Sequence, residues 1–188
     1  MNATLSSPVE PRHRPEAIAE RILPAELRRG RGAATNASGR FELEKREDFD
    51  DGWTRDEAPE PWATEVTWEK PKAIITRNES PDIGFDRSIN PYRGCEHGCF
   101  YCYARPSHAY MGLSAGLDFE TRLFAKERAA ELLERELASP KYRPAPIAFG
   151  ANTDPYQPIE RQYRITRSLI ETLAKARHPL SIVTKSNL

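Results

Sequence analysis

The sequence predicts an α/β fold: an incomplete parallel βα barrel, preceded by a small β-hairpin and a flexible N-terminal extension. Three observations predict it. Apolar runs alternate with amphipathic helical patterns in the second half of the chain, an order typical of parallel βα units with right-handed crossovers. The first third is highly charged and poor in apolar residues. The chain also ends just after an apolar run, so we expect it to be truncated after the third barrel strand.

The predicted extension covers residues 1–61. This segment is rich in proline, arginine and acidic residues, with basic residues followed by acidic ones. It has too little apolar surface to offset the entropy of ordering, and we expect at most one short helix, over residues 16–27. Two interpretations stay open, a solvated tail and a basic arm that touches phosphates.

Ordered structure is expected from Trp62, over residues 62–188. Residues 63–68 and 73–76 are typical of short strands, and the polar turn between them favours a hairpin. Residues 86–93 are predicted to be extended, because Pro91 lacks a backbone donor and disfavours a helical residue before it. This piece leads directly into the segment that contains all the cysteines.

The βα units are expected after that segment. Their helices have apolar residues at helical spacing, and the last two strands are short apolar runs typical of strands buried on both faces. In order, the predicted elements are a strand at 119–124, a helix at 126–139, a strand at 146–151, a helix at 160–177 and a strand at 181–185.

Three cysteines, Cys95, Cys99 and Cys102, lie within eight residues and are the only ones in the chain. An odd number of thiols so close together is not a disulfide framework, whereas three thiolates can hold three corners of an iron-sulfur cube. The fourth iron then keeps an open position. The alternative is a zinc site of three cysteines with His97 or His108, although His97 lies too close to its cysteine neighbours for an unstrained tetrahedron.

The charge balance points to no particular partner. The chain has 188 residues, with 28 Lys and Arg against 28 Asp and Glu, so the net charge gives no sign of a membrane or nucleic-acid surface. No apolar run approaches the roughly 20 residues that span a bilayer. Clustered free thiols fit a reducing compartment, so we expect a cytoplasmic protein with no membrane partner.

The C-x3-C-x2-C spacing, with an aromatic residue before the last cysteine, resembles the radical S-adenosylmethionine (radical SAM) superfamily. Within it, the chain looks like the spore photoproduct lyase-like group, the radical-type DNA repair photolyases. The resemblance covers about residues 62–188, and the expected fold is then the N-terminal part of a radical SAM barrel. Four stretches carry it: Ser88–Cys95, Tyr101–Ala104, Asn152–Glu160 and Val183–Ser186.

The resemblance implies two cofactors, a [4Fe-4S] cluster on the three cysteines and S-adenosylmethionine on its open iron. Tyr101 would contact the adenine, as the family's aromatic residue does. Thr153 and Asp154 would hold the amino acid end of S-adenosylmethionine, and Lys185 would pair with its carboxylate. Tyr103, which follows the last cysteine as in those lyases, would relay an electron or a hydrogen atom.

The implied activity is that of a lyase-like radical enzyme, whose 5'-deoxyadenosyl radical acts on DNA or another nucleic-acid base. An electron donor such as a flavodoxin or ferredoxin would reduce the cluster. One departure matters: photoproduct lyases carry a hydrogen-donating cysteine on the second barrel strand, and residues 150–153 contain none. The alternative function is a non-catalytic, truncated iron-sulfur or zinc-binding module.

Overall fold

The computed structural model describes residues 23, 30–39, 41 and 62–187. The helix expected over 16–27 therefore lies outside the described residues, apart from one position. Along the chain, the described elements are β1 (Glu65–Glu69), β2 (Thr76–Arg77), β3 (Arg87–Ile89), β4 (Tyr92–Arg93), the 3-10 helix η1 (Arg105–Met111), α1 (Asp118–Thr121), β5 (Arg122–Lys126), α2 (Ala129–Leu137), β6 (Ile147–Phe149), α3 (Glu160–Tyr163), α4 (Ile165–Lys175) and β7 (Leu180–Ile182).

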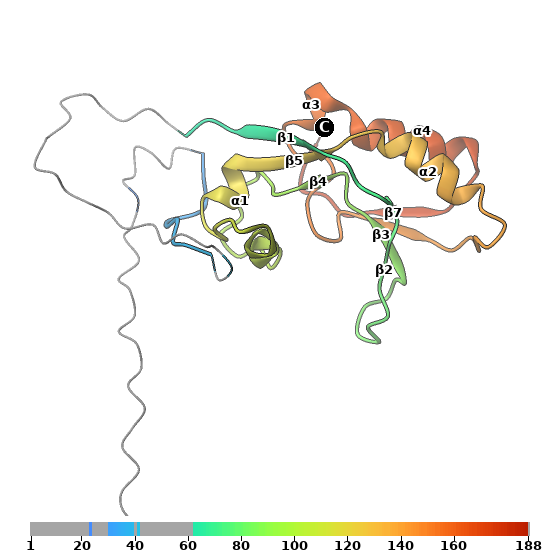
Figure 1. Cartoon of the computed structure of the whole chain (residues 1–188), viewed down its shortest axis with the longest axis horizontal. Coiled ribbons are helices and arrows are strands. Elements are labelled where there is room, and N and C mark those ends of the chain that lie inside the picture. Colours follow the sequence, from blue (N-terminus) through green and yellow to red (C-terminus); the bar gives the residue numbers. More distant parts are fainter. Residues whose placement is uncertain (1–22, 24–29, 40, 42–61, 188) are drawn as a thin grey trace, which may run out of the picture.

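The strands form two sheets (Figure 1). One has the order β2-β3-β6-β7, in which β3, β6 and β7 are parallel and Phe149 of β6 lies in register with Ile89 and Ile182. The other has the order β1-β5-β4, with β5 parallel to β1 and antiparallel to β4. Helix α2 lies between β3 and β6 in the chain, and α3 with α4 lies between β6 and β7. The expected parallel βα units are therefore present, without a closed barrel among the described residues.

The hairpin expected between residues 63–68 and 73–76 is wrong, because β1 and β2 belong to different sheets. The segment between them is drawn into the core instead of turning back. Ile74 is fully buried, and its backbone N–H donates to the Glu136 carboxylate of α2 at 2.5 Å. Burial of Ile74 and this hydrogen bond hold the segment against α2. The next strand, β2, then pairs with β3 in the antiparallel direction.

The strand expected at 119–124 is also corrected. Its first residues form α1, and β5 follows in the sheet that does not contain β6 and β7. The first strand of the parallel set is thus β3, which precedes the cysteines. The helix expected at 160–177 is two helices, because Arg164 has φ of 51°. Glu160 accepts from the N–H groups of Thr166 and Arg167 at 3.0 Å, so its carboxylate satisfies the start of α4.

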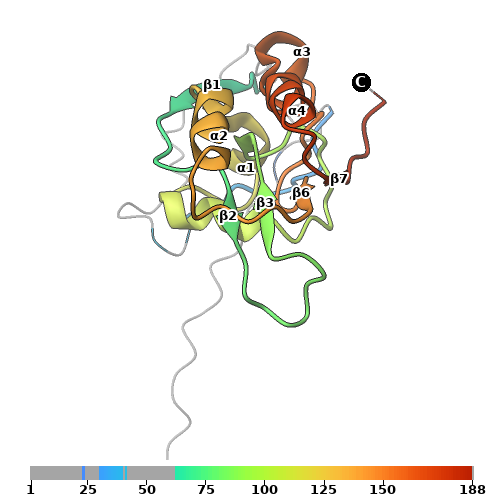
Figure 2. The same ribbon diagram turned by 90° about the vertical axis from the view of Figure 1, so that its right-hand side faces the viewer.

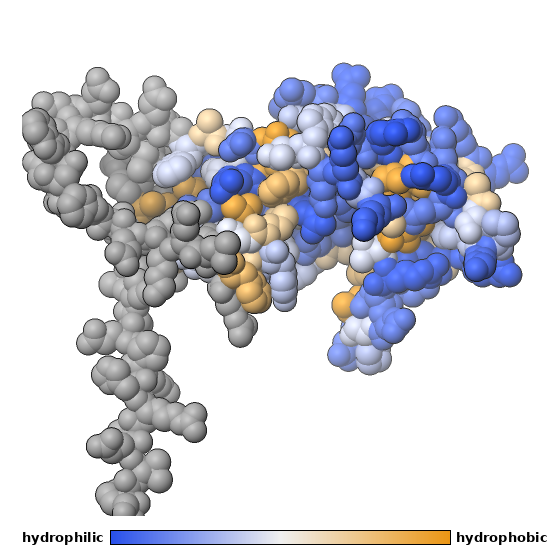
Figure 3. Space-filling view, in the orientation of Figure 1, coloured by the Kyte–Doolittle hydropathy of each residue, from blue (hydrophilic) through white to orange (hydrophobic). Residues whose placement is uncertain are grey.

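The main core lies between the parallel sheet and helices α2 and α4, which lie side by side over it in Figure 2. Helix α4 places Ile165, Leu169 and Leu173 on one buried stripe, the four-residue spacing that aligns side chains on a helix face. All of β6 is buried, as expected for a central parallel strand. Figure 3 shows the outer side of these helices as largely hydrophilic.

Residues 30–39 differ from the expectation of a flexible extension. The Arg31 guanidinium donates to the carbonyl of Glu120 at 2.7 Å, and the N–H of Leu117 donates to the carbonyl of Thr35 at 3.0 Å. Ala33 is 7% exposed. The segment lies beside α1 in Figure 1. Small residues and backbone contacts hold this segment in place. Apolar content alone therefore did not predict that it is ordered.

A membrane-crossing element would be a long apolar helix. None of the helices that the structure describes has that length and apolarity.

We expect Leu169→Ala to destabilise the protein by about 2–5 kcal/mol, because it removes fully buried methyl groups of α4 and leaves a cavity. Urea unfolding followed by circular dichroism measures the effect. Leu137→Ala is the control, because that leucine at the end of α2 is only partly buried against the same core, and its loss should be clearly smaller. Equal losses in the two variants would contradict the packing described here.

Candidate functional site

The cysteine loop, residues 94–103, connects β4 to η1 and depends on two glycines. Gly94 and Gly98 have φ of 74° and 62°, a region that other residues adopt at a cost. A Cβ atom on Gly94 would lie 2.6 Å from Leu123 Cδ2 and 2.8 Å from the carbonyl of Phe119. That carbonyl accepts from the N–H of Cys95 at 2.9 Å. The loop therefore begins pressed against the start of β5.

The three thiols are free and lie in different surroundings. Cys95 is 8% exposed, and burial raises its pKa to about 11. It forms a small apolar cluster with Ala104 and Phe119, against which the half-buried Cys102 packs. Cys99 lies on the side of the loop where Lys185 approaches its sulfur. Binding a metal group through Cys95 would release its proton, and burial makes this release costly.

Lys185 follows β7 and reaches across to the cysteine loop. Its Nζ lies 3.2 Å from Cys99 Sγ, contacts the Tyr101 hydroxyl and stands 4.8 Å from the centre of the Tyr101 ring. The Tyr101 hydroxyl and the Cys99 sulfur raise the pKa of Lys185 above its usual value. The structure thus brings together Cys99, Tyr101 and Lys185, whose positions span most of the described chain.

Asp154 connects the exits of β6 and β7 to the cysteine loop. One of its oxygens accepts from Tyr156 N at 2.8 Å and Thr184 Oγ1 at 2.7 Å, and the other from Lys185 N at 2.7 Å. His97 Nε2 lies 3.4 Å from the second oxygen. Partial burial would raise the pKa of Asp154, but the His97 side chain and these hydrogen bonds outweigh it and lower the pKa to about 2. The carboxylate is therefore charged and bound to protein groups.

The other two predicted site residues contact backbone carbonyls. Thr153 is 2% exposed, and its hydroxyl donates to the carbonyl of Tyr92 at 3.0 Å. The Tyr103 hydroxyl donates to the carbonyl of Ala151, while 75% of this residue stays exposed. Thr153 thus lies beneath the surface of the site, and Tyr103 bridges the cysteine loop to the end of β6.

Two polar residues that the sequence analysis did not single out support the same region. Gln157 is fully buried, and its amide bonds the backbone of the loop twice, donating to Gly94 O at 3.1 Å and accepting from Glu96 N at 3.2 Å. The Asn90 side chain accepts from Asn152 N at 2.9 Å. Their signal in the sequence is weak, because each is only an amide side chain that directly precedes a proline.

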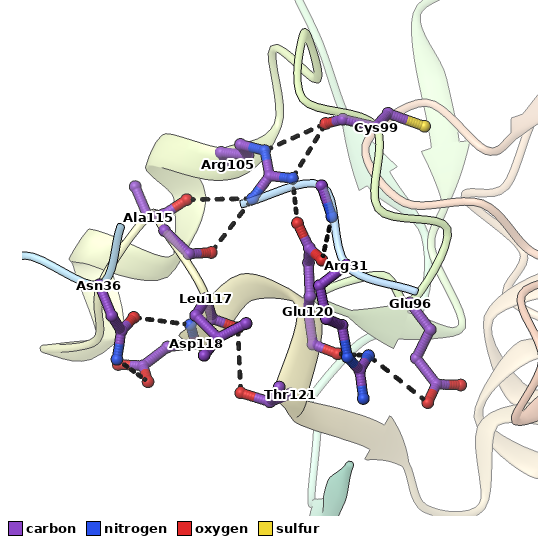
Figure 4. A network of polar contacts seen from close by, with 12 residues as sticks. Arg31, Asn36, Glu96, Cys99, Arg105, Ala115, Leu117, Asp118, Glu120 and Thr121 are labelled. Carbon is purple, nitrogen blue, oxygen red and sulfur yellow. Dashed lines mark hydrogen bonds and ion pairs between the residues drawn. The ribbon is translucent and has the colours of Figure 1, made fainter. Parts of the chain in front are cut away.

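A second support, also missed from sequence, joins η1 to α1. Arg105 donates to the carbonyl of Cys99 through Nε at 3.1 Å and Nη2 at 3.0 Å. The same guanidinium pairs with Glu120, whose side chain is fully buried (Figure 4). A buried carboxylate needs such a partner, because an unpaired charge there is costly.

The three cysteines are the candidate metal ligands of this site. No group of three or more His, Cys, Asp or Glu side chains in the described part of the chain is arranged to hold one metal ion. The geometric requirement of a [4Fe-4S] cluster differs from that of a single ion. Each thiolate binds its own iron, so the three sulfur atoms need not converge on one point. The structure places the three cysteines on one glycine-containing loop, with the Lys185 ammonium beside the sulfur of Cys99.

Comparison with known proteins gives relatives without a stated activity. A protein of Mycobacterium tuberculosis described only as uncharacterized is 44% identical over 106 residues, which are 56% of this chain and 31% of that protein. An uncharacterized protein of Methanocaldococcus jannaschii is 32% identical over 119 residues, 63% of this chain and 42% of that protein. The chain thus spans less than half the length of these curated relatives. No family model matches, and no solved structure does.

We expect Asp154→Asn to make the free energy of unfolding depend less on pH between about pH 6 and pH 3. The folded pKa of Asp154, about 2, lies below the roughly 3.9 of an unfolded aspartate. Its ionised form therefore stabilises the fold above about pH 4, and this contribution is lost as the pH falls towards 2. Urea unfolding at pH 6 and pH 3 should show a larger loss for the unaltered protein than for the variant.

Asp82→Asn, in an exposed turn, is the control for that experiment. Its profile should follow that of the unaltered protein. An equal acid-dependent loss in the Asp154 variant and the unaltered protein would contradict the assigned role of this carboxylate.

Proposed function

We propose that this chain is the N-terminal part of a radical SAM enzyme, with a [4Fe-4S] cluster on Cys95, Cys99 and Cys102. The observation that carries the proposal is the meeting of Lys185 with Cys99 and Tyr101. Lys185 follows the third parallel strand, and ligands of parallel α/β folds gather at the carboxyl ends of strands. The C-x3-C-x2-C spacing with Tyr101 before the last cysteine adds the resemblance to this superfamily.

When bound and reduced, such a cluster supplies the electron that splits S-adenosylmethionine into methionine and a 5'-deoxyadenosyl radical. The protein's own residues bind and orient. An ammonium has three donors, so Lys185 can keep its contacts to Cys99 and Tyr101 and still donate to the carboxylate of S-adenosylmethionine. The exposed Tyr101 ring, 65% accessible, offers a face for the adenine.

Asp154 contributes mainly by placing Lys185. It holds both the N–H of Lys185 and the hydroxyl of Thr184, so its carboxylate fixes the backbone from which the lysine side chain extends. We propose that Thr153 supports the same edge from below through its bond to Tyr92. Thr153 and Asp154 would then help to hold the amino acid end of S-adenosylmethionine indirectly, by fixing the backbone at the ends of β6 and β7.

The proposed substrate class is a nucleic-acid base, with DNA as the proposed partner, and it rests on the resemblance to the spore photoproduct lyase-like group. The exposed Tyr103 is the residue proposed to relay an electron or hydrogen atom, since it lies next to Cys102 and its hydroxyl is held by Ala151. A flavodoxin or ferredoxin would supply electrons, and the proposed compartment is the cytoplasm, where free thiols persist.

We expect Cys99→Ala to abolish cluster assembly and turnover, because removal of one thiol leaves one iron without its protein ligand. Anaerobic reconstitution with iron and sulfide, iron and sulfide analysis, and chromatographic detection of 5'-deoxyadenosine after reduction test this. Ser107→Ala in η1 is the control and should load and react as the unaltered chain does.

Full iron content and turnover in the Cys99 variant would refute the assigned ligands. A loaded cluster in the unaltered chain that yields no 5'-deoxyadenosine would favour the non-catalytic module instead.

We expect Lys185→Met to weaken S-adenosylmethionine binding by roughly 10–100-fold, the usual worth of a hydrogen bond to a charged group. Iron content should stay unchanged, because the lysine is not a cluster ligand. Equilibrium dialysis of the reconstituted protein measures the affinity, and iron analysis of the same sample measures the iron content. Lys175→Met, exposed at the end of α4, is the matched control, and equal affinity in the two variants would contradict the role of Lys185.

A further inference from the structure

An N-terminal segment, residues 30–36, crosses the cysteine loop and is here named the strap. Its backbone lies so close to the loop that only glycine fits at the crossing. A Cβ atom on Gly32 would lie 1.7 Å from the carbonyl oxygen of Gly98, and one on Gly98 would lie 2.9 Å from Gly32 N. Gly98 lies between the first and the second cysteine, so the crossing falls within the predicted metal-binding loop.

The strap makes a second close crossing at the turn before α1. A Cβ atom on Gly116 would lie 2.1 Å from the carbonyl oxygen of Thr35, and this oxygen accepts from Leu117 N at 3.0 Å. Asn36 and Asp118 bond reciprocally: the amide nitrogen donates to the carboxylate at 3.1 Å, and the amide oxygen accepts from Asp118 N at 2.9 Å. Two separate crossings therefore fix the position of the strap.

Glu120 joins the strap to the residues that hold the loop. Its side chain is fully buried, and one oxygen accepts from Gly32 N at 2.9 Å while the other pairs with Arg105 (Figure 4). Arg105 in turn donates to the carbonyl of Cys99. A short chain of contacts thus leads from the strap through Glu120 and Arg105 to the second cysteine.

Arg31 connects the strap to the other side of the loop. Its guanidinium donates to the carbonyl of Glu120 and to Thr64 Oγ1 at 2.8 Å, and lies 4.0 Å from the Glu96 carboxylate. The Thr64 hydroxyl also contacts Glu96. The residue after the first cysteine and the second cysteine itself are therefore both tied to this segment.

We propose that the strap positions the cysteine loop for metal binding, with Arg31, Glu120 and Arg105 as positioning residues. The loop turns at two glycines of positive φ, and glycine loses the most conformational freedom on ordering. A docked strap removes that freedom before the metal group arrives, and preorganised ligands bind more tightly. That a cluster is the group bound rests on the function proposed above, whereas the docking of the strap does not.

The test uses a glycine substitution that opens the crossing without removing a charge. Gly32→Ala places a methyl group against Gly98, and Gly116→Ala does so at the second crossing. Gly84→Ala is the matched control, since a Cβ there meets nothing within 4 Å. Hydrogen–deuterium exchange of the metal-free full chain, followed by mass spectrometry of peptides covering residues 94–105, reports on the loop. Iron content after reconstitution reports on binding.

We expect exchange in residues 94–105 to be roughly tenfold faster in Gly32→Ala and Gly116→Ala, because local opening governs exchange. Peptides from α4 should exchange as in the control, which shows that the body stays folded. Iron retained after passage over a chelating resin should fall in both variants and stay at the unaltered level in Gly84→Ala.

Unchanged exchange of the loop in both variants would refute the proposed role of the strap. Faster exchange with iron retention equal to that of the control would refute it as well. If the unaltered chain binds no iron, the proposed cluster fails, while the exchange data alone still decide whether the strap holds the loop.

Discussion

The cysteine loop depends on the buried carboxylate of Glu120, which joins the N-terminal segment to Arg105. The loop has no helix or strand of its own between β4 and η1, so groups outside it must help to hold its shape. The Glu120 carboxylate binds two of these outside groups, the backbone N–H of Gly32 and the guanidinium of Arg105. Loss of a partner leaves a buried charge uncompensated, at a high cost in free energy, so Glu120 couples the N-terminal segment to Arg105 and Cys99.

A second set of contacts acts from the strand ends. The parallel register of β3, β6 and β7 places the residues after β6 and β7 at one edge. Gly150 has φ of 80°, and a Cβ there would lie 2.2 Å from the carbonyl of Val183, so the two exits can come close only with glycine. Asp154 then bonds across the gap to Lys185. The lysine reaches Cys99 because of this close approach.

Sequence reasoning predicted what repeats along the chain and missed what depends on single contacts. The buried run of β6 and the apolar stripe of α4 follow from periodicity, and the parallel order of the last strands follows from their alternation with helices. The hairpin was wrong because Ile74 and its bond to Glu136 draw the segment inward. The docking of residues 30–39 was missed because glycine crossings and amide pairs leave no apolar pattern. For the candidate site, spacing singled out the three cysteines as candidate ligands, while the contacts of Gln157 and Glu120 became visible only in the fold.

The two sets of contacts meet at Cys99. Its carbonyl accepts from Arg105, which belongs to the strap side, and its sulfur faces Lys185, which belongs to the strand ends. Cys95 differs, being buried and held by the backbone of Phe119. A metal group bound to both residues would therefore have one ligand held in the core, Cys95. The position of its other ligand, Cys99, depends on contacts from both sides of the loop. Because Cys99 is contacted from both sides, a shift in either the strap or the β7 exit changes the position of the same candidate ligand.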